Sequence, residues 1–491
     1  MLKKLVGLMI SICFLFSVGS CGVKGDEDIY TIEYYVIMNG TSAQGDQAKV
    51  QDEINNKLRE KIGAEVNMHI ISDWSYNDSL NLVINSGDDW DICFTSNWTN
   101  NYKRNVAKEA FLDITELLPE YAPSLYNLVD ERVYDAIKVG GKIYATQNLQ
   151  ILPRTPGFTV DKTVFNNYLT ASGTTVGDIK SISDLTPYLA YCKANCDDYN
   201  IISSLDNSGV IVALGYDDIY GTTYPGAVKI TDNANDGLTV YNQFAQNDYF
   251  EIFKLCGQWF ENGYISKDVL TKQFDYTKAF AWLETTWKPG LDGVGTQRAG
   301  KETYSFAFGD SVMYNSWLSC CLSGINSESG NPVKCLQFLE LLNTDKELCN
   351  MFIYGIEGKH YNKVSENRVK VIPDSGYNLS NTSWQFANQF NAYLVDPQED
   401  GVWEETAEIN SKASYSPLVG FNFDYSKFEL ELNNCYSIYN EYMTSFLQGI
   451  YGSGSKLTEK YGQFVSKLEK AGANRIIAEM QKQVDAWLAN K

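Results

Sequence analysis

Apolar positions at the start of the chain's body follow first a strand period and then a helix period. Residues 29–38 form an almost continuous run of Ile, Tyr, Val and Met, which is typical of a buried strand. Val50, Ile54 and Leu58 then recur at helical spacing between charged residues, and residues 64–70 alternate apolar and polar as a second strand. A strand, a crossover helix and a strand predict a parallel α/β sheet.

The pattern continues with a third strand whose end carries polar and aromatic residues. A helix is expected over residues 76–85 and a strand over residues 90–95. In open sheets of this kind, ligands bind at the loops that follow the carboxyl ends of the strands. Residues 39–41 and 95–99 occupy those ends, so both loops are candidates for a binding site.

Later segments predict two lobes, each formed by two separate stretches of the chain. A chain of 491 residues is too long for one core, and residues 151–157 contain two prolines and a glycine, which indicates a hinge. We expect residues 29–150 with 304–373 to form the first lobe and 151–303 with 374–491 to form the second. Helices are expected over residues 111–118, 123–138, 244–259, 331–342 and 476–487.

The composition is acidic and rich in aromatic residues. The formal charge of -21 disfavours nucleic acids and anionic membrane surfaces as partners and favours a neutral or cationic ligand. The 33 Tyr, 23 Phe and 10 Trp supply rings that stack on the C–H faces of sugars, with hydroxyl and indole groups for the sugar hydroxyls. The alternative for any single ring is packing in a core.

The amino-terminal residues resemble a bacterial lipoprotein signal. Two lysines precede an apolar run over residues 5–18, and residues 18–21 read Val-Gly-Ser-Cys, as in a lipobox. The resemblance implies that residues 1–20 are removed, that Cys21 is lipidated and that residues 21–28 form a tether. The alternative is a transmembrane helix, but the apolar run is shorter than the roughly 20 residues that span a bilayer.

No pattern indicates a catalytic or metal-binding centre. Nine of the 11 cysteines lie in the body, an odd number that disfavours a disulfide framework, and we interpret Cys93, Cys256, Cys335, Cys349 and Cys435 as small apolar residues. The pairs Cys192 with Cys196 and Cys320 with Cys321 both lack the second half of a zinc site. With two histidines in the chain, a histidine-based triad is not expected. Acidic pairs such as Asp217 with Asp218 are predicted to be solvated surface. No cofactor and no metal are expected.

Several motifs in order along the chain resemble one known family. They are the stretches 84–92 (INSGDDWDI), 94–98 (FTSNW), 141–145 (GKIYA), 343–346 (NTDK), 354–361 (YGIEGKHY), 384–390 (WQFANQF), 420–424 (GFNFD) and 471–479 (AGANRIIAE). On these the chain resembles the extracellular solute-binding lipoproteins of bacterial ABC importers, in the sugar-importer-type family 1 group with a characteristic C-terminal domain.

The resemblance implies a two-lobed α/β fold of the periplasmic-binding-protein type (type II), with a hinge and an interlobe cleft. It also implies a monomeric, lipid-anchored protein on the extracytoplasmic side of the cell membrane, which captures a neutral carbohydrate and delivers it to an ABC permease. No enzymatic activity is expected. The alternatives are a surface glycoside hydrolase, which needs two carboxylates across the cleft, and a glycan-binding lipoprotein without a permease.

Ligand-binding residues are expected on both walls of the cleft. Trp98 with Asn97 is the strongest candidate, because a loop at a strand end rarely needs an indole unless a ligand stacks on it. Asn39 and Thr41 end the first strand and are further candidates. Trp74 follows the second strand, and its alternative role is to pack the next helix against the sheet. The other candidates, each with packing as the alternative, are Trp282 and Trp287 for the opposite wall, and Trp384, Asn388 and Gln389.

Overall fold

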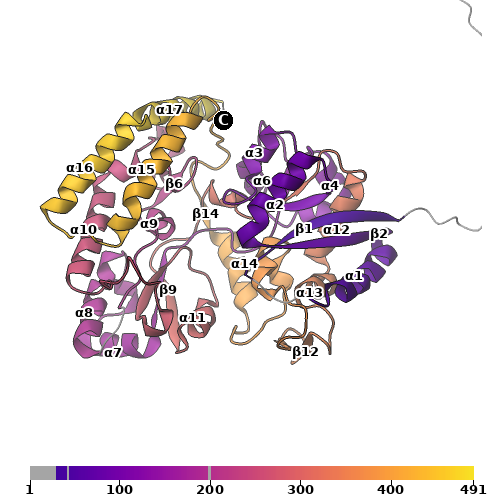
Figure 1. Cartoon of the computed structure of the whole chain (residues 1–491), viewed down its shortest axis with the longest axis horizontal. Helices are drawn as coiled ribbons and strands as arrows, with labels where there is room; N and C mark the ends of the chain where they lie inside the picture. The colour runs from indigo at the N-terminus through magenta and orange to yellow at the C-terminus, as the bar shows by residue number, and fades with distance from the viewer. Residues whose placement is uncertain (1–28, 41–43, 197–200, 491) are drawn as a thin grey trace, which may run out of the picture.

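The computed structural model describes residues 29–40, 44–196 and 201–490. Two lobes lie side by side, joined by several crossings of the chain (Figure 1). Each lobe has its own apolar core. The predicted signal segment, Cys21, the tether and Thr41 lie outside the described residues.

Lobe 1 is built on a five-stranded sheet with the order β2-β1-β3-β11-β4. β1 (Tyr30–Met38) pairs in parallel with β2 (Ala64–Ser72) and with β3 (Ile92–Thr95). β11 (Leu322–Ile325) then lies antiparallel between β3 and β4 (Ala145–Gln147). The parallel sheet predicted from the first strands is therefore confirmed, and a strand from much later in the chain extends it.

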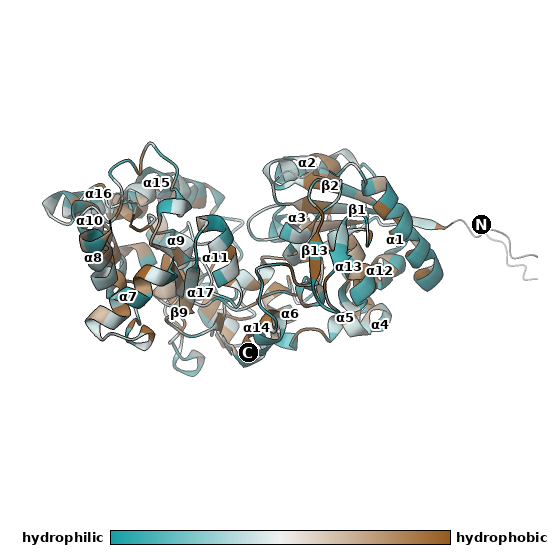
Figure 2. Ribbon diagram, turned by 90° about the horizontal axis from the view of Figure 1, so that it is seen from below, coloured by the Kyte–Doolittle hydropathy of each residue, from teal (hydrophilic) through white to brown (hydrophobic). Residues whose placement is uncertain are grey.

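Helices and a small hairpin cover this sheet. They are α1 (Gln47–Ile62), α2 (Asp73–Ser86), α3 (Tyr102–Ala107), α4 (Leu117–Tyr121), α5 (Pro123–Tyr126), α6 (Glu131–Ile137), α12 (Pro332–Thr344), α13 (Lys346–Tyr354), β12 (Tyr361–Lys363) and β13 (Val369–Val371). As predicted, α1 buries Val50, Ile54 and Leu58 and ends at Gly63, whose φ of 61° is the left-handed conformation that glycine adopts readily. Figure 2 shows hydrophilic residues over most of α1.

Two helix predictions in lobe 1 are wrong. Residues 111–116 are not helical, because the backbone at Phe111 bridges Asn326 and the Leu112 amide donates to the carbonyl of Ile325. The predicted long helix over 123–138 is two short helices, α5 and α6, since the Asp130 side chain caps α6 by accepting from the amide of Arg132.

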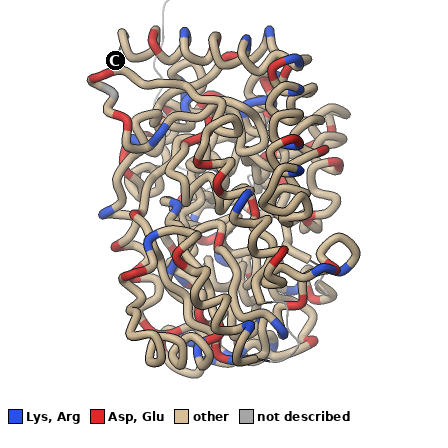
Figure 3. Tube along the Cα trace, turned by 90° about the vertical axis from the view of Figure 1, so that its left-hand side faces the viewer, with Lys and Arg blue, Asp and Glu red and all other residues tan. Residues whose placement is uncertain are grey.

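Lobe 2 contains an antiparallel sheet with the order β8-β5-β9, surrounded by helices. The strands of lobe 2 are β5 (Gly157–Asp161), β6 (Tyr216–Asp218), β7 (Ala227–Lys229), β8 (Ala281–Glu284), β9 (Thr303–Ala307), β10 (Val312–Met313) and β14 (Ser414–Tyr415). Of these, β6 pairs with β7, and β10 with β14, outside the three-stranded sheet. The helices of lobe 2 are α7 (Lys162–Ser172), α8 (Thr186–Asn195), α9 (Asn207–Ala213), α10 (Asn247–Glu261), α11 (Leu291–Ala299), α15 (Glu429–Leu447), α16 (Ser455–Lys470) and α17 (Ala473–Leu488). Acidic and basic positions are interspersed over its outer face (Figure 3).

The chain crosses between the two lobes at positions that differ from the predicted ones. Residues 304–314 stay in lobe 2, because β9 pairs with β5 and Tyr314 joins that core. Residues 374–395 stay in lobe 1, where Tyr377, Leu379 and Phe386 belong to the core. α14 (Val402–Lys412) then lies beside the segment that crosses between the lobes, and its Asn410 bonds the backbone of Gln150 and Leu152.

Within the described ranges, no helix is both long enough and apolar enough to cross a bilayer.

Candidate ligand-binding site

A cavity of about 710 Å³ lies between the lobes and is lined by both of them. Lobe 1 contributes residues 97–98, residues 101–104 and Trp384, and the crossing segments contribute Arg154, Ser316, Trp317, Ser319 and Cys320. Lobe 2 contributes Ser208, residues 218–224, Phe423, Tyr425 and Tyr436. A ligand held here contacts both lobes and the segments that join them.

Two indoles form the wall from lobe 1. The Trp98 and Trp384 rings lie 6.3 Å apart between centroids with an interplanar angle of 31°, and Trp98 remains 49% exposed. The Nε1 of Trp98 donates to the carbonyl of Cys320 over 3.0 Å, which orients the indole and uses its polar group. The face of the ring is therefore available for stacking.

The loop that carries Trp98 is held by hydrogen bonds to itself and to the crossing segment. The Oγ of Ser96 accepts from the amides of Trp98 and Thr99 over 3.1 and 2.8 Å. The Nδ2 of Asn97 donates to the carbonyl of Ser316 over 2.7 Å. Asn97 thus positions the loop against the hinge, with its amide committed to the protein.

Four tyrosines form the wall from lobe 2. Tyr220 lies 4.8 Å from both Tyr224 and Tyr425 between ring centroids, and Tyr224 stacks on Tyr436 at 5.7 Å. Burial raises the pKa of Tyr220, Tyr224 and Tyr425, so their phenols keep their protons at neutral pH. The wall therefore offers ring faces and neutral hydroxyl groups.

Four charged residues line this cavity, namely Lys103, Arg104, Arg154 and Asp218. Burial lowers the pKa of Lys103 to about 8, against the opposing attraction of Asp218 and Asp217. The guanidinium of Arg154 donates to the carbonyls of Ser208 and Thr285, both over 2.7 Å, and lies over the Trp317 ring. Arg154 therefore joins a crossing segment to lobe 2.

Asp217 and Asp218 are buried beside the hinge, so the prediction of a solvated acidic pair is wrong. Asp217 accepts from the amide of Asn315 over 2.8 Å, and the hydroxyl of Ser316 donates to Asp218 over 3.0 Å. Burial, with the negative charge of Asp218 as the second cause, raises the pKa of Asp217 to about 7. The pair fastens β6 to a segment that crosses between the lobes.

Stability is expected to fall as pH rises from about 4 to 8. In that window folded Asp217 keeps its proton up to about pH 7, while an unfolded aspartate has lost it above about pH 4. The folded state binds more protons, so its stability decreases with rising pH, by roughly 2–4 kcal/mol at about 1.4 kcal/mol per pKa unit. Thermal melts of the wild type and of Asp217→Asn, which cannot ionise, test this. The variant's curve should be flatter, and parallel curves would contradict the assignment.

Of the predicted site residues, Trp98, Asn97 and Trp384 line the interlobe cavity. The others that the structure describes lie outside it. The Asn39 side chain bonds the Asn381 carbonyl and the Gln385 amide within lobe 1, and Trp74 is 81% exposed on α2. Asn388 is buried and donates to the Asn343 carbonyl.

The remaining three predicted residues also lie outside the interlobe cavity. Gln389 is buried, and its backbone amide donates to the carbonyl of Leu149. Trp282 is buried against Tyr276 and donates from Nε1 to Glu284. Trp287 lines a different cavity, next to α14. Gln389 and Trp282 are therefore packed within the protein, whereas Trp287 lines a cavity other than the interlobe one.

The tyrosine wall was missed by sequence reasoning. Residues 215–226 (GYDDIYGTTYPG) combine glycines and tyrosines, which is typical of a turn-rich binding loop and is a signal for Tyr220 and Tyr224. No local pattern marks Tyr425 and Tyr436, because they join this wall only through tertiary packing.

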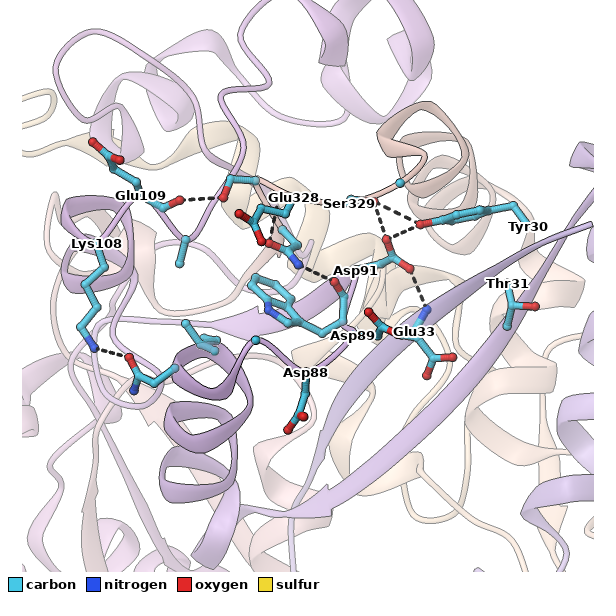
Figure 4. A pocket seen from close by; sticks show the side chains of 18 residues that line it. Tyr30, Thr31, Glu33, Asp88, Asp89, Asp91, Lys108, Glu109, Glu328 and Ser329 are labelled. Atoms are coloured by element: carbon cyan, nitrogen blue, oxygen red, sulfur yellow. Dashed lines mark hydrogen bonds between the residues drawn. The ribbon is translucent and has the colours of Figure 1, made fainter.

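A second cavity, of about 640 Å³, lies within lobe 1 at the amino ends of β1 and β3 (Figure 4). Its lining is acidic, with Glu33, Asp88, Asp89 and Asp91 among its residues. Asp91 accepts from the hydroxyls of Tyr30 and Ser329 and from the amide of Glu33, so this carboxylate is committed to the fold. Among the described residues, no group of three or more His, Cys, Asp and Glu side chains is arranged to hold a metal ion.

The fold and the shared cavity define a class. A two-lobed α/β protein whose aromatic cavity lies between the lobes, beside the segments that join them, has the architecture of the solute-binding proteins of ABC importers. Residues 417–489 match a family described as "Domain of unknown function (DUF3502)". In this chain that region supplies α15, α16, α17 and the cavity residues Phe423, Tyr425 and Tyr436.

Similar proteins support this class. The chain is 26% identical over 466 residues, 91% of its length and 90% of the other, to a "Carbohydrate ABC transporter substrate-binding protein" of Streptococcus pneumoniae serotype 4. The crystal structure of an N-glycan transport solute binding protein (NgtS) from Streptococcus pneumoniae is similar with a TM-score of 0.80 at 24% identity, covering 94% of this chain and 99% of that one. Its complex with Man5GlcNAc has a TM-score of 0.70 at 25% identity, with the same coverage of both chains. The predicted resemblance to importer solute-binding proteins and the two-lobed fold are confirmed.

Proposed function

We propose that this chain is the substrate-binding subunit of an ABC importer and that it captures an oligosaccharide between the Trp98–Trp384 wall and the tyrosine wall. The observation that carries the proposal is the cavity shared by both lobes, with rings on opposite sides. Ring faces pack on the C–H faces of sugars, and phenol and amide groups bond the hydroxyls. Closure of the lobes over the ligand is favoured because only the closed form makes both sets of contacts.

The ligand is a neutral carbohydrate, and the relatives support this class. One relative is named for carbohydrates, and the structure titled N-glycan transport solute binding protein was determined with Man5GlcNAc. The charge of -21 on the whole chain opposes a strongly anionic guest at long range, whereas Lys103, Arg104 and Arg154 outnumber Asp218 in the cavity lining. The captured sugar is delivered to an ABC permease by a monomeric binding protein.

Binding without catalysis is favoured over glycoside hydrolysis. A glycosidase uses two carboxyl groups on either side of the scissile bond. Among the described residues that line the cavity, Asp218 is the one carboxylate, and it already accepts a hydrogen bond from Ser316. A glycan-binding lipoprotein without a permease is the other alternative, and neighbouring permease genes would argue against it.

The chain is held outside the cytoplasmic membrane by lipid on Cys21. Replacing the acceptor thiol, Cys21→Ser, is expected to abolish the incorporation of labelled fatty acid into the full chain in the producing bacterium. Equal labelling of the wild type and the variant would contradict the lipid anchor.

A thermal-shift screen against neutral oligosaccharides, Man5GlcNAc among them, tests the function. A ligand at about 100 times its dissociation constant adds about 2.7 kcal/mol to the free energy of unfolding, which raises the melting temperature by several degrees. Chromatography of the same mixtures after incubation is expected to return the sugar intact. Shortened products would support a hydrolase, and the absence of any shift across the panel would contradict the proposed ligand class.

A further inference from the structure

Two adjacent cysteines lie at the hinge end of the interlobe cavity. Cys320 and Cys321 follow the 3-10 helix Trp317–Ser319 and lead into β11. Both are free thiols and buried, their Sγ atoms lie 3.6 Å apart, and Cys320 lines the cavity. Cys320 is therefore the member of the pair that meets the cavity, and Cys321 is not among the lining residues.

The backbone of this pair holds part of the binding site in place. The carbonyl of Cys320 accepts the hydrogen bond from the Trp98 indole. The carbonyl of Cys321 accepts from the amide of Asn148 over 3.0 Å and from the Nε2 of Gln147 over 3.1 Å. The Cys320 carbonyl thus holds the aromatic wall of lobe 1, and the next carbonyl, of Cys321, holds residues 147–148.

We propose that Cys320 and Cys321 are an oxidative modification site, and that a disulfide between them releases Trp98 and changes the binding wall. Their bond would close a ring that includes the Cys320 carbonyl. The sulfur atoms must approach from 3.6 Å to about 2.05 Å. Neighbouring Cα atoms stand about 3.8 Å apart, below the usual range of about 4.4–6.8 Å for a disulfide, so the intervening peptide plane has to turn.

The oxidant is a small organic disulfide. The Cys320 thiolate attacks one of its sulfurs and expels the first thiolate, and the Cys321 thiolate then displaces the second from the mixed disulfide. Two protons pass from the cysteines to the two released thiols, so two protein thiols are oxidised and one disulfide is reduced. The Nε2 of Gln150 donates to the Sγ of Cys321 over 2.9 Å and supports its anionic form.

Reaction is expected to be slow at neutral pH. Burial, reinforced by the neighbouring Cys320, raises the pKa of Cys321, while the positive charge of Lys288 opposes that rise. Because the thiolate is the reacting form, oxidation is expected to accelerate with rising pH. The strained ring is also expected to be reduced readily by dithiothreitol.

The test uses the reduced full chain treated with 2-hydroxyethyl disulfide, followed by peptide mapping and tryptophan fluorescence. The peptide containing Cys320 and Cys321 should lose two hydrogens, the emission should shift to longer wavelength as Trp98 is released, and dithiothreitol should reverse both changes. Trp98→Phe should still form the disulfide but lose the emission shift. An unchanged peptide, or one that carries only the hydroxyethyl adduct, overturns the proposal.

Matched variants separate this pair from the other thiols. Cys320→Ser should abolish both changes, whereas Cys349→Ser, at another buried cysteine that lies outside the cavity lining, should retain both. A disulfide that forms without any change in the Trp98 emission contradicts the coupling to the binding wall. The test needs no sugar, so its outcome is independent of the proposed ligand.

Discussion

Replacing Trp98 by alanine is expected to lower the affinity for the captured oligosaccharide by about 100-fold, or about 2–3 kcal/mol. The indole is fixed by its hydrogen bond to Cys320 and by its contacts with Phe94 and Trp384, so it presents a rigid face to the ligand. Truncation removes the stacking surface and leaves the rest of the loop held by Ser96. Titration calorimetry with the sugar identified in the thermal-shift screen measures the effect.

Trp74→Ala is the matched control for this prediction. It removes the same side chain from the same lobe, but Trp74 is 81% exposed and is outside the cavity lining. Its affinity is expected to stay within about twofold of the wild type, since surface truncations outside an interface have little effect. Equal losses in both variants, or a wild-type affinity in Trp98→Ala, would show that the ligand does not stack on Trp98.

Gly257→Ala is expected to destabilise lobe 2 by about 3 kcal/mol or more. Gly257 lies within α10, where a Cβ would overlap the backbone carbonyl of Gly452 in the loop between α15 and α16. A Cβ at Gly449 would likewise overlap the carbonyl of Cys256, so the two backbones approach each other closely on both sides. Neither backbone can move aside as a flexible side chain would. Chemical denaturation measures the loss.

Gly462→Ala is the control for helix propensity. Gly462 is exposed within α16, and a Cβ there meets nothing within 4 Å. Alanine is a better helix former than glycine, so this variant is expected to gain up to about 1 kcal/mol. If Gly257→Ala is as stable as Gly462→Ala, α10 does not pack against the C-terminal region as described.

The wall from lobe 1 was predictable because its signals are local. Trp98 and Asn97 follow β3 in sequence, and strand ends are where ligands meet an open α/β sheet. Trp384 was predicted only from a family motif, and it joins this wall through the 3-10 helix Ser380–Gln385. Trp282 sits within β8, where its indole faces Tyr276 rather than the cavity. Aromatic content alone does not separate these cases.

The wall from lobe 2 and the lobe boundaries depend on long-range pairing. Tyr220 meets Tyr425 across some two hundred residues of sequence, and no local periodicity encodes that contact. The return to lobe 1 was placed too early because composition does not reveal that β9 completes the sheet with β5. Burial of Asp217 and Asp218 follows from their hydrogen bonds to Asn315 and Ser316, which only the folded hinge brings near.

The most direct measurement is a crystal structure of the chain with the oligosaccharide that raises its melting temperature. The account predicts a sugar ring on the face of Trp98 and hydroxyl contacts to Tyr220, Tyr224 or Tyr425, with both lobes touching the ligand. A sugar bound outside the interlobe cavity, for example in the acidic pocket beside Asp91, would contradict it.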